Sequence, residues 1–288
     1  MTLCTLYEEF ERNYMAQRLR PSTIRGYRVN IEKHVLPLLG ALDLDEVLAD
    51  TLDGLTNALK PKLGNRSIAY VHATLRKMLN YALRRGYITR NPSAMFDLPR
   101  VERYRYRTLY GGEISRLLTL TRSTPLEVPV TLALCYGLRR GECLGVIPAL
   151  DLDPYARVLH VQRTRSVERG ATVVTPCKTD RSNRRILLAE SHVELLKGLM
   201  QSEGDFACPL SPNALEWQFK AMLRKHGFPA IRFHDLRHSY ATFMLAQDVN
   251  PKIVSTVLGH SGVAITLDIY SHPNLRMQET CLRALAGL

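Results

Sequence analysis

Helical periodicity governs most of this chain and limits what it can fold into. The stretch "NRSIAYVHATLRKMLNYALRRG", residues 65–86, carries apolar residues at helical spacing and closes on a glycine. The same spacing appears over residues 3–14, and again over 24–35 after the sequence "RPST". Apolar residues three and four positions apart lie on one face of an α-helix. The first ninety residues are therefore predicted to be helical, with Pro37 and Gly40 ending the second of these helices.

A break in this pattern follows. The segment "NPSAMFDLPRVERYRYR", residues 91–107, is rich in prolines and arginines, which favours an exposed strap and a domain boundary. Beyond it, helical spacing returns. The sequence predicts helices near residues 112–121, 127–137, 140–147, 190–201, 212–226, 234–247, 251–258 and 262–271.

Between these helices lies a region rich in β-branched residues. Three short runs are typical of strands: "RVLHV" (157–161), "ATVVTPC" (171–177) and "RRILL" (184–188). The turn sequence "TDRSN" separates the last two, which predicts that they pair as a hairpin. The expected fold is mainly α with a small antiparallel β-sheet, divided into residues 1–92, a linker at 93–107, and residues 108–288 ending in a C-terminal helical tail.

Charge and composition narrow the function classes. The chain has 288 residues and a formal net charge of +12, which indicates a polyanionic partner, with nucleic acid ahead of an acidic membrane surface. The most apolar run, residues 128–138, is shorter than the roughly 18 residues that a membrane span needs. The six cysteines show no C-x-x-C pairing and suggest buried thiols in a reducing cytoplasm.

The stretch "HDLRHSY" raises the question of a metal site. His234 and His238 stand four residues apart, so a helix places both on one face, as in the zinc-binding H-E-x-x-H pattern. Asp235, however, is one methylene shorter than the glutamate of that pattern. Arg237 would also place a positive charge beside the metal ion, and no third ligand follows at a recognisable spacing.

A helix that offers His234 and Arg237 suits a phosphate better than a cation, because both side chains donate hydrogen bonds. His238 and Tyr240 would then be packing or helix-face residues. A lone His-x-x-Arg pair is, however, more typical of a solvated helix face than of a phosphate site. Other segments decide between these interpretations: "GLRRGE" with Arg139, "TPCKTDRSN" with Lys178, and "LGHSGVAITLDIYSH" with His260 and Tyr270.

In this order, and with these gaps, the motifs resemble the tyrosine recombinase family of site-specific DNA recombinases and integrases. The resemblance covers nearly the whole chain, since "STIRGYRVNIEKHVLPLLG" and "YALRRGYITRNP" are similar to the helical core-binding domain of phage and transposon integrases. It implies a core-type DNA-binding domain at 1–92 and a catalytic domain at 108–288. Many such integrases carry a further N-terminal domain for arm sites, whereas this chain begins at the core-binding region.

The resemblance also implies the chemistry. Tyr270 would attack the scissile phosphate and form a 3′-phosphotyrosine intermediate, without metal or other cofactor. Arg139 and Arg237 would bind the non-bridging oxygens, and Lys178 would protonate the leaving 5′ oxygen. His234 would accept the tyrosine proton and His260 would donate to a phosphate oxygen. We expect Glu142 to hold an arginine. Tyr240 is a competing candidate for the nucleophile, although its neighbours indicate an apolar helix face.

The implied function is integration or excision of a mobile element. The expected partners are double-stranded DNA at core sites and three further copies in a homotetramer on synapsed DNA, with accessory directionality or DNA-bending proteins as further candidates and no membrane. The expected location is the cytoplasm, at the nucleoid when bound to DNA. Two alternatives stay open: a type IB topoisomerase-like enzyme that relaxes DNA, and a non-catalytic DNA-binding protein of the same fold.

Overall fold

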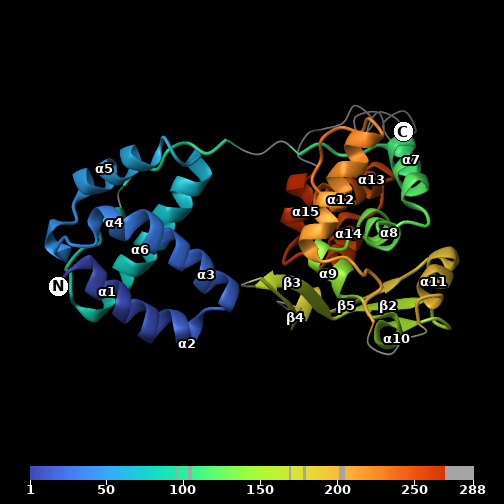
Figure 1. Cartoon of the computed structure of the whole chain (residues 1–288), viewed down its shortest axis with the longest axis horizontal. Coiled ribbons are helices and arrows are strands. Elements are labelled where there is room, and N and C mark those ends of the chain that lie inside the picture. The colour runs from blue at the N-terminus through green and yellow to red at the C-terminus, as the bar shows by residue number, and fades with distance from the viewer. Residues whose placement is uncertain (95, 103–105, 169, 178–179, 201–204, 270–288) are drawn as a thin grey trace, which may run out of the picture. The chain divides into compact units, whose positions relative to one another are not determined.

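The computed structural model describes residues 1–94, 96–102, 106–168, 170–177, 180–200 and 205–269. The chain divides into two compact units, Met1–Tyr104 and Arg105–Leu288. The mainly helical character expected from the periodicity is confirmed, and the strands are few and short (Figure 1).

The first unit is a cluster of helices. They are α1 (Leu3–Phe10), α2 (Ala16–Arg18), α3 (Pro21–Asn30), α4 (Leu36–Leu39), α5 (Ala49–Leu59) and α6 (Asn65–Arg85), with π-helical turns at Glu11–Met15 and Ile31–Val35 and 3-10 turns at Leu44–Glu46 and Pro92–Ala94. The long helix α6 packs against α1 and α3. Its stripe, including Ile68, Leu75 and Met78, is fully buried, as the spacing predicts. Gly86 then ends α6 in the left-handed conformation.

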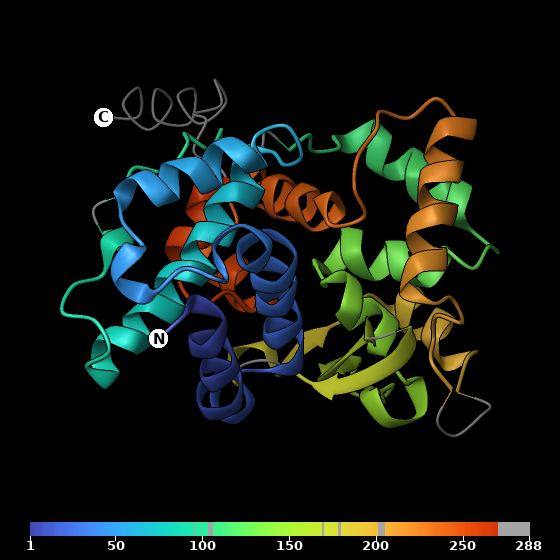
Figure 2. The same cartoon turned by 60° about the vertical axis from the view of Figure 1, so that its left-hand side comes forward.

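The second unit combines helices with two small sheets. Its helices are α7 (Gly111–Thr121), α8 (Glu127–Tyr136), α9 (Arg140–Gly145), α10 (Pro148–Asp151), α11 (Glu190–Lys197), α12 (Pro212–Lys225), α13 (Asp235–Ala246), α14 (Pro251–Leu258) and α15 (Val263–Ile269), with a 3-10 turn at Asp180–Ser182. Its strands are β1 (Leu152–Asp153), β2 (Val158–Val161), β3 (Arg163–Glu168), β4 (Ala171–Pro176) and β5 (Arg184–Leu187). Figure 2 shows the strands gathered at one end of this unit, with α13 towards the other end, and α14 contacts β5.

Strand pairing differs from the sequence prediction. β4 pairs antiparallel with β3, from Arg163 opposite Pro176 to Glu168 opposite Ala171. β5 pairs instead with β2, and β1 completes that three-stranded sheet. The predicted hairpin between residues 171–177 and 184–188 is therefore wrong, and strand β3 was not predicted. Gly170, at φ +82°, lies in the turn that joins β3 to β4.

The core of the second unit is built around α8. This helix buries residues on all sides, including Val130, Leu132 and Leu134, as expected for a helix that is apolar all round. The predicted helix 140–147 ends two residues early, at Gly145, and Pro148 starts a separate short helix, α10. Among the described cysteines, Cys143 and Cys208 are buried, whereas Cys4 is exposed and corrects the expectation of buried thiols throughout. The predicted C-terminal helical tail lies outside the described residues.

Candidate active site

Arg139 lies directly after a tight turn that ends α8. Gly137 closes that helix at φ +65°, and Arg139 then caps the start of α9. The guanidinium of Arg139 donates from Nη1 to Oε1 of Glu142 at 2.7 Å and from Nη2 to the carbonyl of Gly259 at 3.0 Å. The side chain keeps 35% of its surface exposed, so a ligand can reach it.

Glu142 is the buried anion of the site. Its side chain is 1% exposed and accepts from Arg139, from the backbone N–H of Arg139 at 2.9 Å, and from Nη2 of Arg184 at 2.9 Å. Burial by itself would raise the pKa of this carboxyl, but the ion pairs with Arg184 and Arg139 lower it below its ordinary value. The prediction that Glu142 holds an arginine is confirmed, and it holds two.

Arg237 is the most deeply buried cation of the site. It projects from α13 with 2% of its surface exposed, and its Nη1 donates to the carbonyl of Gly137 at 2.7 Å. Burial, followed by the nearby charge of Arg139, lowers the pKa of Arg237 to about 9. Its Nη2 is buried and has no hydrogen-bond partner among the residues that the structure describes. A buried guanidinium with an unused donor favours an anion that completes its hydrogen bonding.

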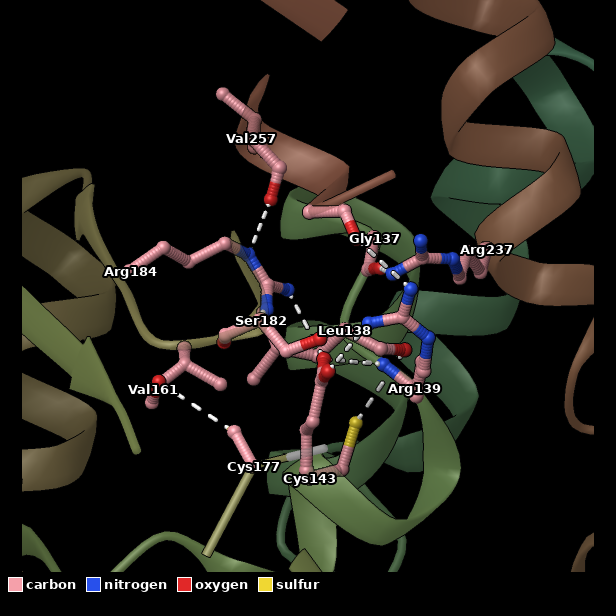
Figure 3. A network of polar contacts seen from close by, with 12 residues as sticks. Gly137, Leu138, Arg139, Cys143, Val161, Cys177, Ser182, Arg184, Arg237 and Val257 are labelled. Atoms are coloured by element: carbon pink, nitrogen blue, oxygen red, sulfur yellow. Dashed lines mark hydrogen bonds and ion pairs between the residues drawn. The ribbon is translucent and has the colours of Figure 1, made fainter. Parts of the chain in front are cut away.

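The two arginines come together from distant parts of the chain. Figure 3 shows their guanidinium groups beside each other, with Arg237 bonded to Gly137, two residues before Arg139. Both residues depend on backbone carbonyls of glycines for their orientation. A pair of cations that leaves donors unused suits a phosphodiester, whose non-bridging oxygens accept several hydrogen bonds.

His260 follows Gly259, which ends α14 in the left-handed conformation at φ +67°. Nδ1 of His260 shares a hydrogen bond of 2.8 Å with the hydroxyl of the buried Thr266 on α15. Burial, and then the charges of Arg237 and Arg139, lower the pKa of His260 to about 4, so the ring is neutral at pH 7. Because Nδ1 is engaged, Nε2 is the ring nitrogen left for a substrate.

His234 caps α13, with its ring edge-on to that of His238 at 5.1 Å between centroids. The residue as a whole is exposed, although its ring is partly desolvated. This loss of solvent, followed by His238 and Arg237, lowers the pKa of His234 to about 4. Tyr106 stacks on the other ring, that of His238, at 4.4 Å. His234 is thus neutral at pH 7 and open to a substrate.

The zinc interpretation of "HDLRH" receives no support from the neighbouring carboxylate. Asp235 is fully buried and is engaged by Arg232, whose Nη2 donates to its Oδ1 at 2.7 Å. Within the described ranges, no three His, Cys, Asp or Glu residues are grouped as metal ligands. Asp235 therefore anchors the start of α13 and does not face a ligand with His234.

Lys178 and Tyr270 lie outside the described residues, so their predicted roles stay predictions. The structure does bring together the other four candidates. Arg139 lies beside Arg237 and donates to the carbonyl of Gly259, the residue before His260. His234 stands at the start of α13, three residues before Arg237.

Tyr240 is removed from solvent. It is 7% exposed in a small apolar cluster with Leu245, Val254 and Leu258. Burial raises the pKa of Tyr240 to about 12. A phenol that is both inaccessible and hard to ionise is a poor nucleophile, so the expectation that Tyr240 serves packing is supported.

Sequence reasoning missed Arg184. Its side chain is 7% exposed and joins the network of Figure 3 through Glu142. A signal was present in the strand "RRIL", because alternate residues of a strand face the same side. Ile186 is buried and Arg185 is exposed, which places Arg184 on the inner face.

Within the described ranges, no helix is long and apolar enough to cross a membrane. Known proteins resemble this chain over both units. The phage integrase family matches residues 107–277, and the N-terminal SAM-like domain of phage integrases matches residues 2–60.

Individual relatives share less than 30% of their residues with this chain. A tyrosine recombinase XerC-like protein of Caldanaerobacter subterraneus is 28% identical over 262 residues, covering 78% of this chain and 66% of that protein. Tyrosine recombinase XerC of Lacticaseibacillus casei is 27% identical over 282 residues, covering 92% of this chain and 91% of that protein. The chain thus spans just under two thirds of the first relative and most of the second.

Solved structures share the fold. The Tn1549 transposon integrase, in complex with transposon right end DNA, superposes with a TM-score of 0.85 at 20% identity, covering 99% of this chain and 100% of that one. A lambda integrase dimer bound to a core site gives a TM-score of 0.70 at 18% identity, covering 93% of this chain and 95% of that one. Since the family match spans more than half of the sequence, the chain belongs to the phage integrase family.

Proposed function

We propose that this protein is a site-specific DNA recombinase that cuts and rejoins strands through a covalent 3′-phosphotyrosine intermediate. The observation that carries the proposal is the pair Arg139 and Arg237, held beside the neutral ring of His260, with a buried donor of Arg237 unused. The names of the relatives, which are tyrosine recombinases and integrases, support the same activity.

In the proposed reaction, the phenol oxygen of Tyr270 attacks the phosphorus of the scissile phosphodiester. A phosphotyrosyl bond forms, the bond to the 5′ oxygen breaks, and Lys178 gives that oxygen a proton. His234 takes the proton of the phenol. The 5′ hydroxyl of a second strand then attacks the phosphotyrosyl bond, which releases Tyr270 and joins the strands. Each ester bond is exchanged for another, so the reaction needs no external energy source.

Arg139 and Arg237 stabilise the negative charge of the transition state. Negative charge concentrates on the non-bridging oxygens as the phosphorus takes a fifth substituent. Fixed donors aimed at that charge stabilise it without rearrangement. His260 adds a hydrogen bond from Nε2, the nitrogen that Thr266 leaves unused. His234, with its low pKa in free protein, becomes a stronger base when the phosphate anion lies beside it.

The same proposal assigns the parts of the chain. Residues 1–92 form the core-type DNA-binding domain, 93–107 the linker, and 108–288 the catalytic domain, and both domains grip double-stranded DNA. The net charge of +12 supports this partner. Assembly as a homotetramer on synapsed sites is supported by the solved lambda integrase tetramer on a Holliday junction. DNA association in the cytoplasm, at the nucleoid, follows from this function.

The test begins with a pool of duplexes of randomised sequence. Covalent protein–DNA adducts are recovered under denaturing conditions and sequenced, and the enriched sequence is rebuilt as a nicked suicide substrate. Wild-type protein is expected to form adducts and joined products. Tyr270→Phe should abolish adducts while DNA binding persists, and Tyr240→Phe is the matched control that should retain them. Adducts that survive in Tyr270→Phe and vanish in Tyr240→Phe would overturn the assignment.

Joined products distinguish the alternatives. A recombinase transfers the strand to a second duplex, whereas a topoisomerase-like enzyme reseals the original one and relaxes supercoils as a monomer. A protein that binds the selected duplex and forms no adduct would be a non-catalytic DNA-binding protein.

A further inference from the structure

Arg184 ties together three segments of the second unit. It projects from β5 with a side chain that is 7% exposed. Its Nη2 donates to Oε2 of Glu142 on α9 at 2.9 Å, and its Nη1 donates to the carbonyl of Ser182 at 3.1 Å. Its Nε donates to the carbonyl of Val257, in the last turn of α14. One guanidinium therefore bridges a strand and two helices.

Through Glu142, Arg184 reaches Arg139. The carboxylate divides its two oxygens between the arginines, because Oε1 accepts from Arg139 and Oε2 accepts from Arg184 and from the backbone N–H of Arg139. Figure 3 shows Arg184 and Arg139 in the same network of polar contacts. Without Arg184, the buried carboxylate of Glu142 would keep Arg139 as its one ionic partner within the described part of the chain. We expect Arg139 to be drawn closer to Glu142 in that case.

Through α14, Arg184 reaches the turn that begins the His260 segment. Val257 lies two residues before Gly259, whose carbonyl accepts from Arg139. A Cβ on Gly259 would lie 3.3 Å from Cδ and from Nη1 of Arg184, so this turn packs directly on the guanidinium. The contacts close a ring from Arg139 through Glu142, Arg184 and α14 back to Arg139. The orientation of Arg139 is thereby fixed from two directions.

We propose that Arg184 is a positioning residue for DNA strand cleavage, which holds Glu142 and the Gly259 turn so that Arg139 and His260 meet the scissile phosphate in register. This inference rests on the proposed function. Arg184 itself is nearly enclosed, and its Nε, Nη1 and Nη2 all donate to protein acceptors, so it acts through Arg139 and His260 and does not touch the DNA. A supporting group of this kind matters because small misplacements of a reacting group cost much of the rate.

The test compares two neighbouring arginines on the same strand. Arg184→Met removes the charge and keeps a long apolar stem, and it is expected to slow adduct formation on the order of 10²-fold at saturating protein. Arg185→Met is the matched control, because Arg185 is exposed on the opposite face of β5, and it should cleave at the wild-type rate. Equal rates for the two variants would overturn the proposal.

A double-mutant cycle separates positioning from general stability. If Arg184 acts through Glu142, Arg184→Met should slow a Glu142→Gln protein far less than it slows wild type. If the rate losses of Arg184→Met and Glu142→Gln multiply in the double variant, the two residues act independently and the proposal is refuted. Arg184→Lys keeps the charge but lacks the planar fork, so it should recover part of the rate of Arg184→Met. If Arg184→Met does not fold, Arg184→Lys is the variant to compare with wild type. An Arg184→Lys protein that is folded and cleaves at the wild-type rate would then contradict the proposal.

Failure of the wider function would look different. Wild-type protein that forms no adduct on any duplex would contradict the proposed recombinase activity. A wild type that cleaves, together with an Arg184→Met that cleaves equally well, would contradict only the positioning role.

Discussion

At the scale of a single residue, the unused donor of Arg237 has the clearest consequence. Nη2 is buried without a partner in the described part of the chain, while Nη1 is held by Gly137. A phosphate oxygen that reaches Nη2 gains a charge-assisted hydrogen bond. The residue is thus set to act on the bound phosphate, and its main effect should be on rate.

Arg237→Ala and Arg139→Ala are each expected to raise the barrier to cleavage by about 2.7–4 kcal/mol, the usual loss for one transition-state donor. Duplex affinity should change little, because many other cations contribute to binding. Single-turnover adduct formation at saturating protein measures this. Arg140→Ala is the control, because Arg140 pairs with Glu216. A variant that binds weakly but cleaves normally once saturated would contradict the assigned role.

The depressed pKa values of the histidines predict a pH dependence of folding. The pKa of His260 is lowered from 6.5 to about 4 in the folded chain, so the unfolded chain binds more protons between these values. Stability therefore rises with pH across this window and is lost as pH falls from about 6.5 towards 4.

Thermal unfolding of the second unit between pH 4 and 7 checks this. His260→Asn keeps a partner for Thr266 and removes the titration, so the slope in this window should become shallower. His34→Asn, in the first unit, is the control. A slope that is unchanged in His260→Asn would show that the loss of stability has another source.

At the scale of elements, the turn between α8 and α9 fixes the site. Gly137 has φ +65°, and a Cβ there would lie 2.7 Å from Cδ1 of Tyr240 and also strike the side chain of Leu258. Gly137 is therefore required by its backbone angle and by close packing together, and its carbonyl orients Arg237.

Gly137→Ala is expected to destabilise the second unit on the order of 2–4 kcal/mol, from positive φ and overpacking combined. Gly227→Ala is the matched control, because Gly227 has φ +64° in the same unit with nothing within 4 Å of its added Cβ. Denaturant unfolding of both variants measures the difference. Equal losses would mean that the packing against Tyr240 and Leu258 contributes nothing.

Elements also show what the sequence could predict. Helices with a clear apolar stripe, such as α6, lie where the spacing places them, because burial of one face is a local pattern. The strands are harder to predict from the sequence. β3 and β4 are mostly exposed or half-buried and are held by pairing with each other, so their sequences carry little of the alternation that marks a half-buried strand. Gly170, which marks the turn between β3 and β4, is a better hairpin signal than "TDRSN".

The residues of the site could be predicted from the sequence, whereas the contacts that hold them in place could not. Arg139, His234, Arg237 and His260 could be named from motifs. Their fixing contacts join Arg139 to Gly259, 120 residues away, and Arg237 to Gly137, 100 residues away. No local period encodes such contacts, since they depend on how α8, α13 and α14 pack. Arg184 remained unnamed for the same reason.

At the scale of the whole molecule, the net charge of +12 makes DNA binding dependent on salt. Each phosphate that a cation neutralises releases counterions, so the logarithm of affinity falls linearly with the logarithm of salt concentration, by about 0.9 per contact. With about six or more contacts, affinity for random-sequence duplex should fall on the order of 10³-fold between 50 and 200 mM salt. Fluorescence anisotropy of the full chain measures the slope, and a flat response would contradict an electrostatic grip.

The hydrogen bond between His260 and Thr266 has a further consequence for timing. Thr266 belongs to α15, the helix directly before Tyr270 in the sequence, and it is fully buried. A displacement of α15 would therefore rotate or release the His260 ring as well. In the proposed reaction, this one hydroxyl group would link the His260 ring to the helix that precedes the nucleophile. On that proposal, a movement of α15 that displaced Tyr270 would also remove a hydrogen-bond donor from the phosphate, so cleavage and phosphate binding would fail together.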